Sequence, residues 1–441
     1  MGRHSHSRAL NIWMNGELLG QWTVKRNGVH ELVYADSWSS SASSRPLSLS
    51  LPMTGQSLQG RAVENYFDNL LPDSVDIRRR VQTQFRTPSN SAFDLLSAIG
   101  RDCVGAVQLM PQDAQPTGWN TIEAQALSPT EVERWLSRVA APAHRMGESD
   151  EESFRISLGG AQEKTALLWH QGQWCRPHGA TPTTHILKLP IGLVGNRQAD
   201  MSTSVENEWL CAQLAKAFGL PVANCEIVQW GAQKTLVVER FDRRLEPSGQ
   251  YWLRLPQEDF CQALGLPSHL KYEADGGPGL RQLSALLRTS ANATDDLRTL
   301  FEAQFFFWML GATDGHAKNF SLSMLAGGSY RLTPLYDILS AWPIVGTGAQ
   351  EVPSARLKMA MALRGKSPHY LVKSIQPRHF LETAQREGYA DMAGSMHRMG
   401  TQVSGALQEV AQRLPGDFPQ ALFDKVAEGM LDMARRMAAG G

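Results

Sequence analysis

Apolar and polar positions change their spacing along the chain, and these changes divide it into three regions. The first region opens with alternating apolar residues around Asn15-Gly16 and again around Asn27-Gly28. Asn-Gly between alternating apolar runs is a strong signal for a β-hairpin, because both residues accept the left-handed backbone of a tight turn. We therefore predict that a small β-rich element opens the chain.

Helical spacing follows these hairpins within the first region. Residues 64–85 show it on both sides of Pro72, residues 91–111 are typical of a helix followed by a strand, and residues 128–139 are typical of a short linker helix. A polar stretch then indicates a boundary. Residues 1–147 are predicted to form an N-terminal α+β subdomain that ends with the linker helix.

The second region, residues 148–255, is predicted to be rich in strands. Residues 153–177 have the pattern of strands around a glycine-containing loop and a hairpin, and residues 184–190 form another short apolar run. A helix capped by Ser204 and ended by Gly219 is expected before two more strands. An antiparallel sheet with one helix is implied.

The third region, residues 256–441, is predicted to be mostly helical. Helical spacing appears at 279–288, in the aromatic-rich run up to about residue 310, and from about 376 to 438. The expected fold class is therefore α+β. A β-rich N-terminal subdomain precedes a core with a sheet-rich lobe and a helical lobe.

Composition describes an ordinary globular protein. Hydrophobic residues make up 42% of the 441 residues and charged residues 20%, far from the composition of disordered chains. The sequence contains no apolar run of about 18 residues and no apolar signal-peptide core at its start. The five cysteines are widely spaced and never form a CxxC pair, which argues against a disulfide framework or a zinc site. A cytoplasmic location is expected.

Charge is balanced overall, with 43 basic and 43 acidic residues, so no global field favours nucleic acid. The stretch from Arg356 to Arg398 is locally basic, with eight Lys/Arg against Glu382, Glu387 and Asp391. On composition alone this stretch is interpreted as a solvated helical surface. A contact with nucleic acid would have to be local.

The loop "GATDGHAKNFSLS" at 311–323 carries the most specific chemical signal. Asp314 and Asn319 lie five positions apart, and an alternating hairpin pattern after them brings Asp337 back toward the same loop. Phosphoryl transfer needs a residue that orients the attacking hydroxyl and oxygen ligands for Mg²⁺. Protein kinases place an Asp, an Asn and a second Asp with this spacing, whereas D-x4-N alone would equally suit a surface turn.

The sheet-rich lobe supplies candidates for a nucleotide site. The run "SLGGAQEKTALL" lacks the Gly-Lys-Ser/Thr ending of a P-loop, because Glu163 precedes Lys164, but its glycines suit a phosphate-covering turn between strands. Lys188 lies in a short strand, where a solvent-facing side chain is the simpler interpretation. Glu208, on the following helix, is the preferred partner if Lys188 instead binds phosphates. The strand ending at residues 239–241 would meet adenine through its backbone.

Several longer motifs resemble those of the HipA-type serine/threonine kinases, which are toxins of bacterial toxin–antitoxin pairs. The motifs span nearly the full length and include "RPLSLSLP", "FDNLLPDS", "GAQEKTALL", "TPTTHILKLPIG", "VERFDRR", "GATDGHAKNFS" and "PRHFL". This resemblance implies an ATP- and Mg²⁺-dependent protein kinase with a kinase-like core behind a β-rich N-terminal subdomain.

The resemblance also assigns roles by position. Asp314 resembles the catalytic aspartate, Asn319 and Asp337 resemble the metal ligands, and Ser157 matches a serine that such kinases phosphorylate on themselves, which would silence the enzyme. The nucleotide-binding residues implied in this way are Gly159, Gly160, Ala161, Gln162, Glu163, Lys164, Lys188, Glu239, Arg240, Phe241, His316, Lys318, Asn319, Tyr336 and Asp337.

The partners implied by the resemblance are a HipB-type helix-turn-helix antitoxin and operator DNA, and the implied substrate is an aminoacyl-tRNA synthetase, with glutamyl-tRNA synthetase preferred. Arg378 and Arg386 are the candidate DNA contacts. The chain departs from the family pattern near them, because Glu387 would repel phosphate. Two other interpretations stay open from the residues: a nucleotide-binding corepressor with vestigial catalysis, and a small-molecule kinase on the same fold.

Overall fold

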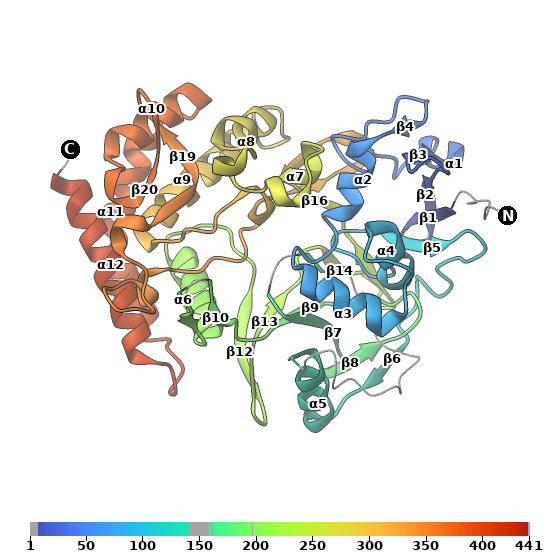
Figure 1. The fold of residues 1–441 in the computed structure, drawn as a ribbon, viewed down its shortest axis with the longest axis horizontal. Coiled ribbons are helices and arrows are strands. Elements are labelled where there is room, and N and C mark those ends of the chain that lie inside the picture. Colours follow the sequence, from blue (N-terminus) through green and yellow to red (C-terminus); the bar gives the residue numbers. More distant parts are fainter. Residues whose placement is uncertain (1–7, 141–157, 160–161, 196, 440–441) are drawn as a thin grey trace.

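The computed structural model of the chain describes residues 8–140, 158–159, 162–195 and 197–439. Figure 1 shows the N-terminal strands and the last helices at opposite ends of the molecule. The strand-rich middle of the chain and the helices that follow it lie between them. The α+β arrangement expected from the sequence is confirmed.

An antiparallel five-stranded sheet, in the order β4-β3-β2-β1-β5, forms the N-terminal region. Asn15 and Gly16 join the first two strands with positive φ angles of 46° and 82°, so the first predicted hairpin is confirmed. Trp22 stacks on Phe67 at 3.8 Å between ring centroids in the core of this region. The elements are β1 (Arg8–Met14), β2 (Glu17–Val24), β3 (His30–Tyr34), α1 (Asp36–Ser39), β4 (Leu58–Gln59), α2 (Arg61–Asp68), α3 (Val75–Phe85), α4 (Ala92–Ile99) and β5 (Gln108–Pro111).

A six-stranded antiparallel sheet, in the order β12-β13-β9-β7-β8-β6, forms the middle of the molecule. The linker helix α5 packs on this sheet, because Val132 and Leu136 share a core with Leu167 and Leu187. The sheet elements and the linker helix are β6 (Ala124–Ala126), α5 (Pro129–Ala140), β7 (Lys164–His170), β8 (Gln173–Pro177), β9 (His185–Lys188), β12 (Cys225–Trp230) and β13 (Gln233–Glu239). Two short ribbons flank it: β10 (Gly192–Val194) with β11 (Ala199–Met201), and β14 (Arg243–Leu245) with β15 (Trp252–Arg254).

The helix α6 (Ser204–Ala217) corrects one sequence prediction. Thr203 occupies the N-cap and Ser204 is the first helical residue. The Ser204 hydroxyl accepts a hydrogen bond from the Ile191 N–H at 2.9 Å instead of capping the helix. Gly219 follows the end of the helix with a φ of 76°, so the predicted stop is confirmed.

Helices dominate the last region, around the largest hydrophobic core. They are α7 (Phe260–Ala263), α8 (Leu280–Leu287), α9 (Ala293–Leu310), α10 (Pro377–Glu387), α11 (Met392–Ala411) and α12 (Gln420–Ala439). The strands β16 (Gln257–Asp259), β17 (Ser321–Met324) and β18 (Tyr330–Leu332) form a small sheet. The predicted hairpin between Asn319 and Asp337 is therefore confirmed.

The basic stretch 356–398 is only partly the solvated helical surface that its composition suggested. It begins with a hairpin of β19 (Lys358–Arg364) and β20 (Pro368–Leu371), and β19 is buried from Met359 to Leu363. This strand was missed because its apolar positions do not alternate with polar ones.

Among the described residues, no helix is long and apolar enough to cross a bilayer. All five cysteines are free, as expected.

Candidate active site

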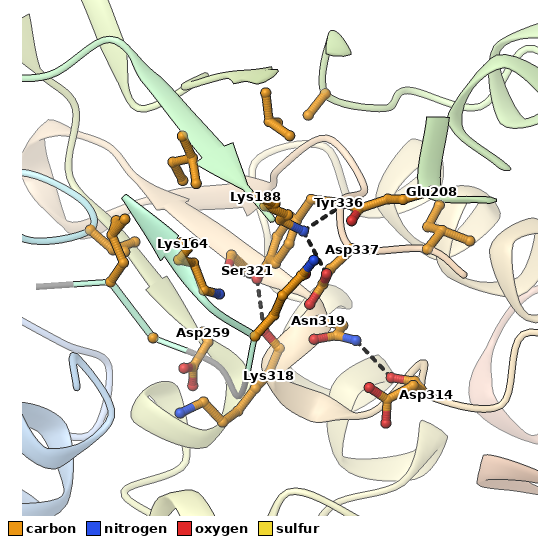
Figure 2. Close-up of a pocket in the computed structure, with 18 of the residues that line it drawn as sticks. Lys164, Lys188, Glu208, Asp259, Asp314, Lys318, Asn319, Ser321, Tyr336 and Asp337 are labelled. Atoms are coloured by element: carbon orange, nitrogen blue, oxygen red, sulfur yellow. Dashed lines mark hydrogen bonds and ion pairs between the residues drawn. The ribbon is translucent and has the colours of Figure 1, made fainter. Parts of the chain in front are cut away.

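A cavity of about 410 Å³ lies where the three regions meet. Its walls include Lys188 from β9, Glu208 from α6, Asp314 and Asn319 from the loop after α9, and Asp337 from the segment after β18. Figure 2 shows these side chains converging on one space. The cavity therefore brings together the residues that the sequence grouped by spacing.

Lys188 is buried and lies between two carboxylates (Figure 2). Its Nζ donates to Glu208 Oε1 at 2.6 Å and to Asp337 Oδ1 at 2.6 Å. The solvent-facing interpretation of Lys188 is wrong, and the predicted pairing with Glu208 is present. Burial disfavours the ammonium form, but Asp337 and Glu208 outweigh it and raise the pKa of Lys188. A buried lysine paired in this way stays charged.

Asp337 is the acidic centre of this group. Its backbone is left-handed, with a φ of 60°, a conformation that is uncommon for residues other than glycine and is found at functional sites. Burial opposes ionisation, but Lys188 and Lys164 hold the pKa of Asp337 well below its usual range. Burial also raises the pKa of Glu208 to about 6 and lowers that of Lys164 to about 8. Asp337 is therefore the carboxylate most strongly held in its ionised form.

Asp314, in the loop after α9, accepts two hydrogen bonds, one from within the loop and one from another segment. The Asn319 amide nitrogen donates to the backbone oxygen of Asp314 at 2.7 Å (Figure 2). The Tyr272 hydroxyl donates to the Asp314 carboxylate. Burial raises the pKa of Asp314, while the bond from Tyr272 lowers it. The Asp314 side chain keeps 54% of its surface accessible and lines the cavity, so a hydroxyl in the cavity can reach its carboxylate.

His316 packs its ring against Tyr272, with centroids 4.9 Å apart. Its Nε2 lies 3.9 Å from Asp314 Oδ1, and its buried Nδ1 makes no hydrogen bond to any described residue. Burial, followed by the charge of Lys271, lowers the pKa of His316 to about 3. A neutral imidazole orders this loop and does not supply a charge.

Lys318 points toward the N-terminal region. Its Nζ lies 2.9 Å from Asp73 Oδ1 and 3.4 Å from the backbone oxygen of Asn69. The Tyr336 hydroxyl donates to the Lys318 backbone oxygen at 2.8 Å and lies 2.5 Å from the Ser321 hydroxyl. Lys318 lines the cavity, but its charge is already paired.

The strand end at Glu239, Arg240 and Phe241 lines the same cavity. The backbone N–H groups of Glu239 and Arg240 donate to Asn224 and Thr184 oxygens at 2.8 and 2.9 Å. The Phe241 ring lies 5.9 Å from that of Tyr336. This segment offers a backbone edge and two aromatic rings to a flat ligand.

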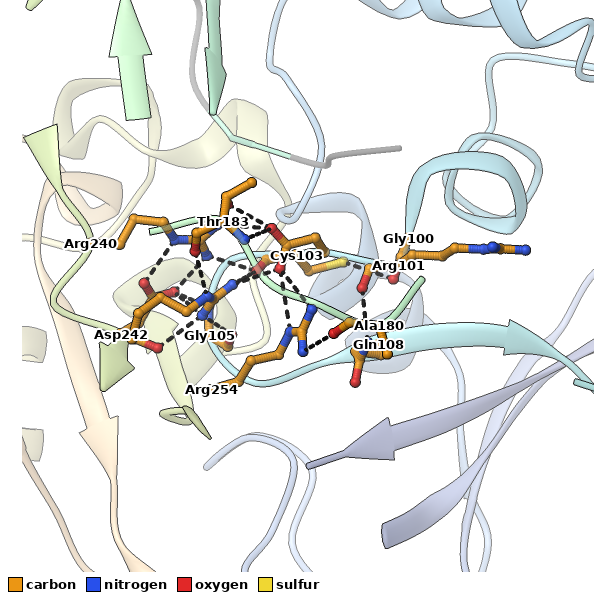
Figure 3. A network of polar contacts seen from close by, with 12 residues as sticks. Gly100, Arg101, Cys103, Gly105, Gln108, Ala180, Thr183, Arg240, Asp242 and Arg254 are labelled. Atoms are coloured by element: carbon orange, nitrogen blue, oxygen red, sulfur yellow. Dashed lines mark hydrogen bonds and ion pairs between the residues drawn. The ribbon is translucent and has the colours of Figure 1, made fainter. Parts of the chain in front are cut away.

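The Arg240 side chain leaves the cavity and enters a buried cluster of charges shown in Figure 3. Its guanidinium binds both carboxylate oxygens of Asp242, at 2.9 and 2.8 Å. Arg243 and Arg254 bind Asp102 at 2.9 and 3.2 Å. The cluster joins the loop after α4 of the N-terminal region to the strand end that lines the cavity.

Two oxygen donors could hold a magnesium ion. With its amide nitrogen bonded to Asp314, Asn319 can present its amide oxygen, and Asp337 presents an ionised carboxylate. Mg²⁺ in kinases uses one or two protein oxygens together with substrate phosphates and water. No group of three or more His, Cys, Asp or Glu forms a metal site in the described part of the chain. The pair fits a metal that is completed by a nucleotide.

The predicted phosphate loop is only partly described. Ser157, Gly160 and Ala161 lie outside the described residues, as does the predicted boundary at 147. Gln162 donates its side-chain amide to the Leu189 oxygen at 2.6 Å, and Glu163 forms an ion pair with Arg80 of α3. Gly159, Gln162 and Lys164 line the cavity.

The two candidate DNA contacts lie on α10, away from the residues that line the cavity. Arg378 is exposed in the first turn of the helix. Arg386 donates to the Gly365 oxygen at 3.2 Å and lies 3.5 Å from Glu382. Their proposed role stays a prediction.

Sequence reasoning missed Asp73, Lys271 and Tyr272, which also approach Asp314 or Lys318. Lys271 and Asp73 form an ion pair of 2.8 Å at the cavity wall. Asp73 follows Pro72 in a motif of the N-terminal region, more than 200 positions from Asp314. No spacing rule connects segments so far apart, although the motif itself was singled out.

Two family models and several known proteins match this chain. A family model described as "HipA-like C-terminal domain" matches residues 156–417, and one described as "HipA N-terminal domain" matches residues 10–110. "Putative kinase Y4mE" of Sinorhizobium fredii is 36% identical over 76% of this chain and 77% of its own length. "Serine/threonine-protein kinase toxin HipA" of Shewanella oneidensis is 30% identical over 74% of this chain and 73% of its own.

A solved structure has the same fold over almost the whole chain. It is the Shewanella oneidensis toxin–antitoxin complex of HipA, HipB and operator DNA. The match has a TM-score of 0.79 and 24% sequence identity, and covers 98% of this chain and 97% of the other. The two-lobed core behind a β-rich N-terminal subdomain is thereby confirmed as the fold class.

Proposed function

The chain belongs to the HipA family and is a serine/threonine-protein kinase, and we propose that it acts as the toxin of a toxin–antitoxin pair. The position of Lys188 is the observation that supports a kinase active site in this cavity. Lys188 lies between Glu208 and Asp337, in the cavity that also contains Asp314 and Asn319. Phosphoryl transfer by protein kinases depends on such a lysine–glutamate pair beside a metal-binding aspartate.

ATP is the proposed phosphate donor, as its kinase family implies. Lys188, held by Glu208, contacts the phosphates, and the segment Gly159–Lys164 covers them. Adenine lies against the strand end at residues 239–241. The Phe241 N–H makes no hydrogen bond to the backbone of another described residue and is available to the base. Tyr336 and Phe241 flank this position, which suits a flat base.

Asp314 is the proposed catalytic residue. Its carboxylate accepts the proton of the attacking serine or threonine hydroxyl, or orients that hydroxyl toward the phosphate. Asn319 and Asp337 would hold Mg²⁺, which neutralises phosphate charge when bound. His316 and Tyr272 order the Asp314 side of the loop. Lys318, already paired with Asp73, acts at a distance from the transferred group.

The partners are proposed from the family. The substrate is a translation component of the aminoacyl-tRNA synthetase class, with glutamyl-tRNA synthetase preferred, and phosphorylation of Ser157 inactivates the kinase itself. A HipB-type antitoxin holds the toxin and joins it to operator DNA. The relative whose solved complex contains HipB and operator DNA supports this assembly. Arg378 and Arg386 on α10 are the proposed local phosphate contacts.

The test compares the wild type with Asp314→Asn in the presence of γ-labelled ATP and Mg²⁺. We expect wild type to label Ser157 and Asp314→Asn to lose at least about a hundredfold in rate, the scale of losing a general base. Asp295→Asn, an exposed aspartate on α9 paired with Arg298, is the matched control and should label normally. Peptide mass spectrometry locates the phosphate.

The same variants expressed in cells test the toxin role. Growth arrest by wild type that Asp314→Asn abolishes supports a kinase toxin. Equal labelling of wild type and Asp314→Asn would remove Asp314 from catalysis. Arrest that persists in an unlabelled Asp314→Asn variant would favour the corepressor.

A further inference from the structure

One carboxylate of the N-terminal region reaches the catalytic loop. Asp73 lies between α2 and α3, and its two oxygens bind different lysines. Oδ1 lies 2.9 Å from Lys318 Nζ, and Oδ2 lies 2.8 Å from Lys271 Nζ. All three side chains are largely buried and line the cavity that contains Asp314.

Each of these lysines immediately precedes a residue that holds Asp314. Lys318 precedes Asn319, whose amide donates to the Asp314 backbone oxygen at 2.7 Å. Lys271 precedes Tyr272, whose hydroxyl donates to the Asp314 carboxylate. The two segments also touch directly, since the Ala317 N–H donates to the Lys271 oxygen at 3.3 Å.

Asp73 connects the segments of Lys318 and Lys271 through its charge. Asp73 is the partner that both ammonium groups share, so removing its charge loosens both segments together. Lys271 and Lys318 outweigh burial and lower the pKa of Asp73 to about 2, which keeps it ionised. Lys318 stays charged despite burial because Asp259 and Asp73 raise its pKa.

We propose that Asp73 is a positioning residue for phosphoryl transfer: through Lys318 and Lys271 it fixes the two segments that hold Asp314. Asp73 acts from the N-terminal subdomain, which thereby becomes part of the catalytic centre. This inference rests on the proposed catalytic role of Asp314. It predicts a defect in the chemical step and leaves nucleotide binding nearly intact, because Asp73 acts on the supports of Asp314 and not on Lys188.

A nearby aspartate provides a matched control. Asp68, at the end of α2, accepts from Arg78 at 2.6 Å and from the Ser268 hydroxyl at 3.0 Å. It also joins the N-terminal region to the last region, but it contacts neither lysine. Asp68→Asn therefore reports on docking of the subdomain alone.

The experiment measures kcat and, by calorimetry, the affinity for a non-hydrolysable ATP analogue with Mg²⁺. Asp73→Asn is expected to lower kcat about ten- to a hundredfold, the scale of a small misplacement of a catalytic group, with analogue affinity within about twofold. Asp68→Asn should keep kcat near wild type. Adding Asp73→Asn to the Lys271→Met, Lys318→Met double variant should cause no further loss, because coupled residues are not additive.

Three outcomes of the kinetic measurements would overturn the inference. They are an unchanged kcat in Asp73→Asn, an equal loss in Asp68→Asn, and a further full loss on the lysine double variant. A second readout does not need catalysis: acetic anhydride should modify Lys271 faster in Asp73→Asn than in wild type or Asp68→Asn, as mass spectrometry would show. An unchanged rate of modification in Asp73→Asn would show that the ion pair of Asp73 with Lys271 does not exist in solution. Faster modification in Asp73→Asn, together with a wild type that transfers no phosphate, would refute the proposed function and leave the ion pair standing.

Discussion

At the residue scale, a few buried charges set the chemistry of the cavity. Lys188 stays charged because it has two carboxylate partners, and Asp337 stays ionised because Lys188 and Lys164 face it. Asp314 differs, since burial raises its pKa and no described lysine or arginine forms a salt bridge with its carboxylate. The site thus separates one carboxylate suited to a metal from one suited to a proton.

The hydroxyl of Tyr272 is predicted to tune Asp314. Tyr272→Phe removes a hydrogen bond that favours the ionised carboxylate, so the pKa of Asp314 rises further. The acid limb of the kcat–pH profile should move to higher pH, with a larger loss of rate at about pH 6 than at about pH 8.

Initial rates of phosphate transfer across this pH range measure the effect. Tyr251→Phe is the control, because Tyr251 packs on Trp119 and does not line the cavity. A Tyr272→Phe profile that superimposes on wild type would show that the hydroxyl does not act on the titrating group.

At the element scale, the end of α9 determines where the catalytic loop begins. Gly311 follows the helix with a φ of 63°, and its N–H donates to the helix end. A Cβ built on Gly311 would lie 2.7 Å from the Trp342 ring. Only glycine meets both the backbone and the packing requirement here.

Gly311→Ala is predicted to destabilise the protein by about 1–3 kcal/mol, because it adds backbone strain and overpacks Trp342. Urea unfolding measures the change. Gly388→Ala is the control: Gly388 also ends a helix with positive φ, but its nearest contact, Arg288 Cδ, is 3.6 Å away. A loss in Gly311→Ala no larger than in Gly388→Ala would contradict a role for Trp342 packing.

At the scale of the whole molecule, two groups of buried charges among the described residues help to tie the N-terminal region to the core. One is the pair of ion pairs that Asp73 forms with Lys318 and Lys271. The other is the cluster of Asp102 and Asp242 with their arginines. Figure 3 shows Asp242 in this cluster, where the Gly105 N–H and Arg240 both bind it. Such contacts leave little freedom for the subdomain to separate from the nucleotide cavity.

Asp102→Asn is predicted to cost about 3–5 kcal/mol, because it removes the buried carboxylate that pairs with Arg254 and one of the two that pair with Arg243. Burial opposes ionisation, but Arg243, Arg240 and Arg254 hold the pKa of Asp102 well below its usual range. The stabilisation is therefore present above the unfolded pKa of about 4 and is lost as pH falls below it.

Urea unfolding at pH 7 and at pH 3 measures both effects. The difference between wild type and Asp102→Asn should be large at pH 7 and smaller at pH 3. Asp76→Asn, an exposed aspartate near Arg79, should match wild type at both. A difference that does not shrink on acidification would contradict the charge-based account.

The local elements and the order of the chemical groups along the chain can be predicted from the residues alone. The Asn-Gly hairpin, the stop at Gly219 and the hairpin between Asn319 and Asp337 follow from short-range periodicity and turn chemistry, which a few neighbouring residues control. The motifs shared with the HipA family added the fold and the kinase assignment.

Contacts between distant segments, in contrast, are visible only in the folded molecule. The sequence pattern favours a solvent-facing Lys188. In the folded protein, α6 and the segment after β18 enclose Lys188 and pair it with Glu208 and Asp337. Asp73 and Tyr272 were not predicted as site residues, because their partners lie 245 and 42 positions away. Burial and pairing of charges depend on packing between separate elements, and no local pattern of residues encodes that packing.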